Sequence, residues 1–302
     1  MSRNKGFGSK KEEPVVKDPL LRQEEGRIYS MPALYDLAFG YRNFEHEVDF
    51  LLYAHEQFAG STAASVLELA AGPARHSLEA LLLDDGSIRR ATALDSSSEM
   101  VKYGKDLATQ ELGEAITSFQ YLEGDMRNFH VPQTHDTAWI LLGSLQHMTT
   151  NDDVQACFRN VHKALNPGGT LILELPHPRE TFSMVECTRN GWEVPLEDDA
   201  GDAYGELQIV WGDENDTFDP ITQVRQFSVS MEIKSDLPVS GLKSVKEIVP
   251  IRLFTSQEIC ALATSCHFKI VAMFGALDEE VSVNDDEAFR LVCVLQKTMD
   301  EH

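Results

Sequence analysis

Short apolar runs alternate with amphipathic stretches through the middle of the chain. Apolar runs bounded by small or polar residues predict buried strands, whereas apolar positions three and four residues apart predict helices. Together these patterns predict strands over 65–69, 91–94, 118–122, 137–142 and 170–175, and helices over 74–83, 97–110 and 152–165. Strands that alternate with helices indicate an α/β fold with a doubly wound, mostly parallel sheet, whose ligands bind at the carboxyl ends of the strands.

The pattern before and after this region is different. Two helical stretches, 29–40 and 45–58, are expected ahead of the first strand. After the fifth strand, alternating positions predict antiparallel strands, and the last two strands follow a single helix with an acidic loop between them. The expected elements are strands over 205–211, 222–233 and 244–251, a helix over 256–266, and a final antiparallel hairpin over 268–274 and 289–295 at the sheet edge.

These elements suggest three parts of the chain. Residues 1–28 are expected to form a disordered arm, because they mix charges and contain no apolar core segment. Residues 29–177 and 251–298 would form the main sheet domain. Residues 178–250 would form an inserted antiparallel β cap over the ligand site.

Composition narrows the range of partners. The net charge of −23 disfavours nucleic acid, which most of this surface would repel. No apolar stretch approaches the roughly 18 residues of a membrane helix, and the N-terminal residues resemble neither a secretory signal nor a transit peptide. The five cysteines are scattered without metal-ligand spacing, so neither a disulfide framework nor a metal site is expected. A cytoplasmic protein without nucleic-acid or membrane partners is therefore predicted.

The most informative stretch is 65–77, where a strand runs through Glu68 into a turn of small residues and then into a helix. Small residues let a ligand approach the backbone, and the first helical turn offers free N–H groups. This geometry is typical of a nucleotide-binding site. Gly72 permits the close approach, and Ala70 and Ala74 are expected to adopt ordinary backbone angles.

Five segments in order resemble the class I S-adenosylmethionine (SAM)-dependent methyltransferases, over residues 29–297. They are the glycine-type turn 68–74, Asp95 after the second strand, Asp125-Met126 after the third, the fourth strand 136–142, and the turn 166–169 before the fifth. Residues 35–37 resemble a segment that many small-molecule members fold over the cofactor. The resemblance implies a seven-stranded Rossmann-like sheet with a reversed last strand, SAM as cofactor, and a small-molecule acceptor.

The resemblance assigns a cofactor role to eleven residues. Asp95 would accept hydrogen bonds from the ribose hydroxyls, and it follows Gly72 by 23 residues, near the spacing of nucleotide-binding βαβ units. Its alternative role is to cap the next helix, and Ser96, Ser97 or Ser98 is a candidate for the N-cap itself. The cofactor set is Tyr35, Glu68, Ala70, Gly72, Arg75, Asp95, Ser96, Asp125, Met126, Leu142 and Gly143.

Within this set, Glu68 would face the amino-acid tail of the cofactor. Asp125 would accept from the adenine amino group, and Met126 would cover the ring or belong to the core. The backbone at Leu142-Gly143 would pass the methionine part. Arg75 has an ordinary position in the first turn of a helix as its alternative.

Methyl transfer from a sulfonium is an in-line displacement that depends mainly on positioning. A general base helps when the acceptor carries a proton that must leave, and imidazole titrates near neutrality. His147, just after the fourth strand, and His177, just after the fifth, are the candidates. For each, the competing interpretation is a structural hydrogen bond.

Three other functions remain in view. A non-catalytic SAM-fold binding or scaffold protein would fit the replaced glycines. An aminopropyltransferase would be expected to carry acids after the fourth strand, which 142–147 lacks, and a dehydrogenase would be expected to show a complete Gly-x-Gly-x-x-Gly. The acceptor and the oligomeric state stay open, because a fold does not determine the reaction.

Overall fold

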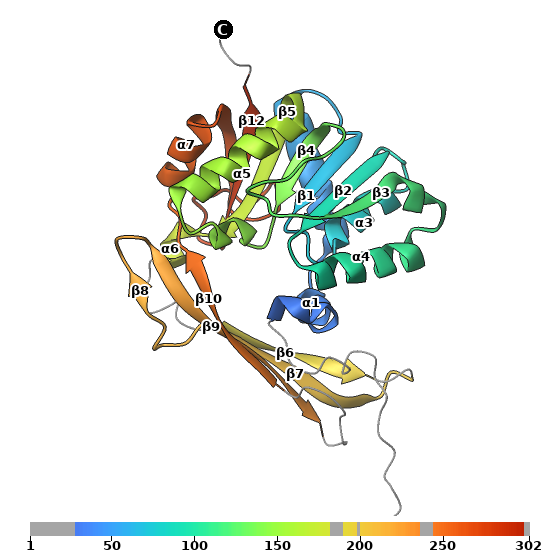
Figure 1. The fold of residues 1–302 in the computed structure, drawn as a ribbon, viewed down its shortest axis with the longest axis vertical. Coiled ribbons are helices and arrows are strands. Elements are labelled where there is room, and N and C mark those ends of the chain that lie inside the picture. The colour runs from blue at the N-terminus through green and yellow to red at the C-terminus, as the bar shows by residue number, and fades with distance from the viewer. Residues whose placement is uncertain (1–27, 182–189, 198–199, 236–243, 299–302) are drawn as a thin grey trace, which may run out of the picture.

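The described residues form two β-sheets, with a main α/β unit above and a smaller sheet below (Figure 1). The computed structural model describes residues 28–181, 190–197, 200–235 and 244–298. Residues 1–27 of the expected disordered arm lie outside these ranges. The main sheet has the strand order β11-β12-β5-β4-β1-β2-β3.

The seven strands of the main sheet confirm the predicted fold class. β1, β2, β3, β4 and β5 run parallel, and β12 is antiparallel to both of its neighbours, so the last strand is reversed. β11 and β12 pair as the predicted antiparallel hairpin, but only β11 is at the edge, since β12 lies between β11 and β5. The strands are β1 (Ser65–Leu69), β2 (Arg90–Asp95), β3 (Phe119–Glu123), β4 (His135–Ile140), β5 (Leu165–Pro176), β11 (Phe268–Phe274) and β12 (Arg290–Lys297).

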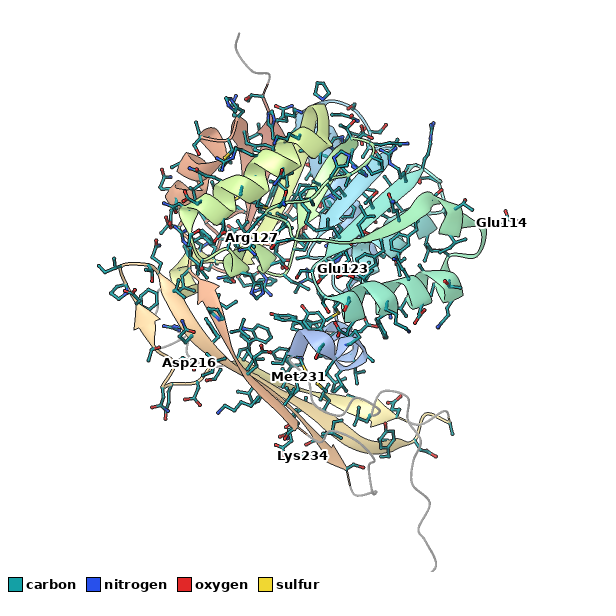
Figure 2. The ribbon with its side chains drawn as sticks, viewed as in Figure 1. Glu114, Glu123, Arg127, Asp216, Met231 and Lys234 are labelled. Atoms are coloured by element: carbon teal, nitrogen blue, oxygen red, sulfur yellow. The ribbon has the colours of Figure 1, made fainter. Side chains whose placement is uncertain are left out.

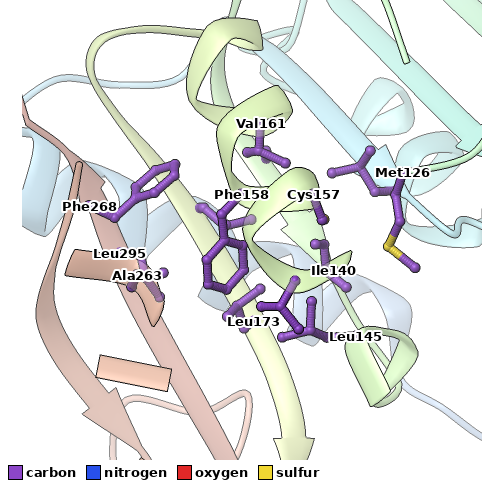
Figure 3. Packing of buried hydrophobic residues seen from close by; sticks show 14 of the residues in the cluster. Met126, Ile140, Leu145, Cys157, Phe158, Val161, Leu173, Ala263, Phe268 and Leu295 are labelled. Carbon is purple, nitrogen blue, oxygen red and sulfur yellow. The ribbon is translucent and has the colours of Figure 1, made fainter. Parts of the chain in front are cut away.

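Helices cover both faces of this sheet. On one face, Phe158 of α5 packs with Phe268, Leu173 and Leu295 in a cluster of buried apolar side chains (Figure 3). On the other face, a second cluster joins apolar residues of α2, α3 and α4 to the sheet. The helices are α2 (Phe44–Ala59), α3 (Arg75–Leu82), α4 (Ser98–Glu111), α5 (Asn151–Ala164) and α7 (Ser256–Thr264).

Side-chain caps explain where several helices begin. The Ser97 hydroxyl accepts a hydrogen bond from the Met100 N–H at 3.2 Å, so Ser97 is the N-cap among the three predicted serines. Thr150 caps α5 in the same way, and Thr255 forms a capping box with Glu258 at the start of α7. Each cap satisfies a backbone N–H that the first helical turn leaves without an intrahelical acceptor.

The smaller sheet is antiparallel, with the order β10-β9-β7-β6 and the two-residue β8 beside β9. One face carries alternating apolar residues such as Leu207, Val229 and Met231, which pack against the N-terminal helix α1 (Pro32–Phe39) (Figures 1 and 2). Sequence patterning predicted β7, β9 and β10 and missed β6 and β8. The strands are β6 (Asn190–Glu197), β7 (Ala203–Trp211), β8 (Phe218–Asp219), β9 (Val224–Ser235) and β10 (Ser244–Arg252).

The described residues also include the 3₁₀ turns η2 (Ile28–Ser30), η3 (Gly113–Ser118) and η4 (Ser144–His147). A four-residue helix, α6 (Pro178–Thr181), follows β5. Within the described ranges, no helix has the length and apolar character needed to cross a membrane.

Candidate functional site

A cavity of about 740 Å³ lies where the carboxyl ends of the main strands meet α1 and the smaller sheet. Its volume falls within the range of roughly 300–1,000 Å³ that is usual for small-molecule sites. Eight of the eleven predicted cofactor residues line this cavity. One of them belongs to α1 and the others to the main unit: Tyr35, and Ala70, Asp95, Ser96, Asp125, Met126, Leu142 and Gly143. The candidate base His147 also lines the cavity.

Asp95 stands at the end of β2 with both carboxylate oxygens directed by backbone donors. Oδ2 accepts from the Gly72 N–H at 2.8 Å, and Oδ1 accepts from the Ser97 N–H at 2.9 Å. Burial raises the pKa of this carboxyl, although the backbone donors oppose the shift. Each oxygen retains acceptor capacity toward the cavity, because a carboxylate has about four lone-pair sites.

Asp125 is held by its own turn. Its carboxylate accepts from the Arg127 backbone N–H at 2.8 Å and from the Arg127 Nε at 3.0 Å. These hydrogen bonds to Arg127 hold the pKa of Asp125 below its usual range, although partial burial opposes the shift. Met126 belongs to the main apolar cluster and also lines the cavity.

In the turns after β1 and β4, several residues other than glycine have a positive φ in the left-handed region. Ala70 has φ of 51° and Ala74 has φ of 64°, so the expectation of ordinary backbone angles at these alanines was wrong. Leu142 also has φ of 53°, and Gly143 follows it with φ of 70°. The tight turns after β1 and β4 impose this conformation, which L-residues adopt at a cost of roughly 1–2 kcal/mol each.

Three residues of the predicted cofactor set do not line the cavity. Gly72 lies beneath Tyr35, whose Cε1 would be 3.7 Å from a β-carbon added there. Arg75 forms an ion pair with Asp36 of α1 at 2.6 Å and thereby fastens this helix to α3. Glu68 is buried, and its Oε2 accepts from the Ser77 N–H and hydroxyl at 3.0 and 2.6 Å.

Glu68 is the first member of a row of side chains with alternating negative and positive charge. In order, the row consists of Glu68, His76, Glu47, Arg42, Glu174 and Arg290. His76 Nδ1 lies 3.5 Å from Glu68 Oε1, and its Nε2 lies 2.7 Å from Glu47 Oε2. Burial disfavours a charged His76, but the hydrogen bonds to Glu47 and Glu68 outweigh burial and raise its pKa to about 9. His76 is therefore an imidazolium at neutral pH.

The row continues toward the cavity through Arg42. Its Nε donates to Glu47 at 2.9 Å, and its Nη1 and Nη2 donate to the two oxygens of Glu174 at 3.2 and 3.0 Å. Glu174 also accepts from Arg290 Nε and from the Leu142 N–H, at 2.9 and 2.8 Å. Burial disfavours the Glu174 carboxylate, but Arg42 and Arg290 outweigh burial and lower its pKa. The sequence analysis missed all four of Arg42, Glu47, Glu174 and Arg290.

His147 lies on the 3₁₀ turn after β4, with its Nε2 3.2 Å from the Tyr29 hydroxyl. The two rings meet edge to face, with centroids 5.4 Å apart. Burial lowers the pKa of His147 and raises that of Tyr29, so both are neutral near pH 7. The pair offers a neutral imidazole to the cavity.

His177 is placed differently. Its Nε2 lies 2.9 Å from the Val283 carbonyl oxygen, and its Nδ1 lies 3.2 Å from the Arg179 N–H. It is buried and does not line the cavity. With Nε2–H donating to Val283 and Nδ1 accepting from Arg179, both ring nitrogens are engaged by the backbone.

Aromatic rings form the wall of the cavity opposite the main sheet. Phe39 of α1 packs edge to face against Trp192 and Trp211, with centroids 5.5 and 6.1 Å apart. Tyr35 stacks on Phe39 at 4.6 Å, and burial raises the Tyr35 pKa. Trp192 Nε1 donates to the Ala38 carbonyl at 2.8 Å, which fixes the first strand of the smaller sheet to α1.

The described side chains contain no cluster of three or more histidine, cysteine or acidic residues arranged to hold a metal ion. The cavity lining includes two aspartates that accept hydrogen bonds from backbone N–H groups, Asp95 and Asp125, together with the neutral His147 and the aromatic walls.

Comparisons with known proteins agree with this geometry. Residues 66–169 match the model of a family described as a methyltransferase domain. No curated protein sequence matches the chain.

Solved structures extend the likeness to most of the chain. An S-adenosylmethionine-dependent methyltransferase from Clostridium acetobutylicum is 16% identical, with a TM-score of 0.68 over 88% of this chain and 97% of that one. DesVI of Streptomyces venezuelae is 16% identical, with a TM-score of 0.66 over 88% and 97%. The sugar N-methyltransferase KedS8 from Streptoalloteichus is 14% identical, with a TM-score of 0.65 over 97% and 100%. Residues 66–169 are thus similar to a methyltransferase domain, and the overall fold is the one found in solved S-adenosylmethionine-dependent methyltransferases.

Proposed function

We propose that the protein transfers a methyl group from SAM to a small-molecule acceptor held between the main sheet and the smaller sheet. The observation that carries the proposal is Asp95, a carboxylate oriented by two backbone donors at the end of β2 inside the cavity. A carboxylate in this position suits a pair of hydroxyl donors such as those of a ribose. When bound, SAM supplies a methyl group on a positively charged sulfur, which is already a good leaving group.

Other residues of the cavity suit the rest of the cofactor. Asp125 offers carboxylate acceptors beside the apolar Met126, a combination that fits an adenine with its amino group. The backbone at Leu142-Gly143 and the turn at Ala70 provide close approach, because these turns place small groups or bare backbone at the surface of the cavity. Tyr35 lies over Gly72 and would shield this end of the site from water.

Gly72, Arg75 and Glu68 would then act behind the cavity. Gly72 directs Asp95 through its N–H, and Arg75 holds α1 in place through Asp36. Glu68 belongs to the row of charges that ends at the cavity. We assign these three residues to positioning the site.

Proton removal falls to His147 among the two candidate histidines. Its imidazole is neutral, faces the cavity and lies beside Tyr29, whereas the ring nitrogens of His177 are engaged by the backbone. Where the acceptor loses a proton, His147 takes it at a ring nitrogen while Tyr29 holds the ring in orientation. Sugar and amino-pentose N-methyltransferases among the structures of similar fold make an amine on a small molecule a reasonable first class to screen.

The decisive measurement is calorimetric titration of the purified protein with SAM and with S-adenosylhomocysteine. We expect saturable binding that Asp95→Ala abolishes and Asp95→Asn weakens. Asp106→Ala, an exposed aspartate on α4, is the matched control and should bind normally. No binding of either ligand to the wild type would refute the proposal and favour a non-catalytic scaffold.

A further inference from the structure

Arg290 lines the cavity, and only one nitrogen of its guanidinium is hydrogen-bonded to a described residue. It begins β12, its Nε donates to Glu174 at 2.9 Å, and its guanidinium lies 4.9 Å from the centre of the Phe289 ring. The side chain is 30% exposed and lines the cavity. Among the described residues, none accepts a hydrogen bond from its Nη1 or Nη2.

Arg290 is the last member of the row of charges and the one that lines the cavity. Positive and negative groups alternate from Glu68 through His76, Glu47, Arg42 and Glu174 to Arg290. The acidic end is satisfied, because Ser77 donates twice to Glu68. The basic end has only one of its donors engaged, so two nitrogens of a fixed guanidinium fork are available for a planar oxyanion.

The other charged side chains of the cavity already have partners. Asp95 accepts from backbone N–H groups, and Asp125 is paired with Arg127. Arg127 in turn also contacts Asp153 at 3.3 Å. Arg127 is therefore paired with two carboxylates, whereas Arg290 is paired with Glu174 alone. Neither Nη1 nor Nη2 of Arg290 has a hydrogen-bond acceptor among the described residues.

Its place in the sheet separates Arg290 from the cofactor end of the proposed site. The order β12-β5-β4-β1-β2 places Arg290 and Asp95 four strands apart, or about 19 Å at the usual strand spacing. Pro176, its partner on β5, also lines the cavity. On the smaller sheet, Trp192, Trp211 and Phe227 supply an apolar wall.

We propose that the acceptor is an anion, with a carboxylate bound by Arg290 and an apolar, aromatic-sized body against the tryptophan wall. This inference rests on the proposed methyl transfer, because it names the substrate class of that site. Glu174 engages Nε alone, so Nη1 and Nη2 of this cavity-lining residue are available for a bidentate contact. A neutral analogue would offer the Nη1 and Nη2 donors no charged acceptor and would bind less tightly.

The test uses benzoate and benzamide, which share a ring and differ in charge. Each is titrated calorimetrically into the full-length protein, with and without S-adenosylhomocysteine. We expect benzoate to bind at least roughly ten-fold more tightly than benzamide to the wild type. Arg290→Gln should abolish this preference, and Arg290→Lys should keep part of it. Arg159→Gln, an exposed arginine on α5, is the matched control and should keep the full preference.

The variants separate the possible failures. Arg42 and the Leu142 N–H still contact Glu174 in Arg290→Gln, so we expect a folded protein, checked by its S-adenosylhomocysteine affinity. No benzoate binding at millimolar concentration, equal binding of the two probes, or a preference that survives Arg290→Gln would overturn the inference. So would a loss confined to S-adenosylhomocysteine affinity, since Arg290 would then serve the carboxylate of the cofactor. Failure of the wild type to bind S-adenosylhomocysteine counts instead against the proposed function.

Discussion

The imidazole of His147 shows how burial sets the chemistry of a single residue. Because burial lowers its pKa below the ordinary value near 6.5, the ring stays neutral and able to accept a proton at neutral pH. On an acceptor identified by transfer of a labelled methyl group, we expect turnover to hold constant from pH 8 down to about 6.5 and to fall only at lower pH.

Replacing this residue should reveal the same role. We expect His147→Gln to lower turnover by roughly 10²- to 10⁴-fold while S-adenosylhomocysteine affinity changes little. His130→Gln, which alters an exposed histidine away from the cavity, is the control. Equal turnover in His147→Gln and the wild type would remove the base from the mechanism, and His177→Gln should then be tested for the same loss.

The backbone of Ala70 is strained, and a substitution at this one position can measure the strain. Its φ of 51° favours glycine, so we expect Ala70→Gly to raise the free energy of unfolding by up to about 1 kcal/mol. The neighbouring Ala71 lacks a positive φ, and Ala71→Gly should instead lower stability by a similar amount. Urea denaturation compares the two variants. If Ala70→Gly lowers the free energy of unfolding instead, the packing lost with the methyl group outweighs the backbone strain that is relieved.

At the scale of elements, α4 and β3 meet at Gly104. A β-carbon there would overlap the Tyr121 ring and lie 3.1 Å from the Pro73 carbonyl oxygen. We therefore expect Gly104→Ala to destabilise the protein by about 1–3 kcal/mol, although alanine is the better helix former by about 1 kcal/mol. Thermal unfolding measures the difference. An unchanged or higher melting temperature would mean that the Tyr121 ring can shift without loss.

The elements themselves were largely predictable, because their periodicity records burial on one or both faces. β1 is apolar apart from Ser65 and Glu68, and α4 follows a serine cap, so both were located to within about a residue. β6 was missed because Asn190–Glu197 places a glycine, a proline and two acids among its apolar residues. Its strand character comes from pairing with β7, a long-range contact that local periodicity does not record.

At the scale of the whole molecule, the candidate site divides into predictable and unpredictable parts. Asp95, Asp125 and His147 follow strand ends, and topology brings such ends together at one edge. Arg42, Glu174 and Arg290 come from a loop, a central strand and the last strand. Their meeting depends on tertiary packing, so no spacing in the sequence marks it. The left-handed φ of Ala70 likewise depends on the turn that the sheet imposes.

The row of charges from Glu68 to Arg290 ties α2, α3, β1, β5 and β12 together, so its protonation should be visible in global stability. His76 has a pKa of about 9 in the folded protein and near 6.5 in the unfolded chain. Between these values the folded state holds a proton that the unfolded state has released. Stability from this group is therefore complete below pH 6.5 and is lost as pH rises through 9, by at most about 1.4 kcal/mol per pH unit.

Urea unfolding at pH 7 and pH 9 should show this loss in the wild type and a smaller one in His76→Gln. The buried thiols of Cys157 and Cys293, whose pKa values are raised by burial, also destabilise the folded state toward alkaline pH, but they do so equally in both proteins. The difference between the two proteins thus isolates His76. Parallel pH dependences would show that Glu47 and Glu68 do not hold an imidazolium, and that the row is broken between α2 and α3.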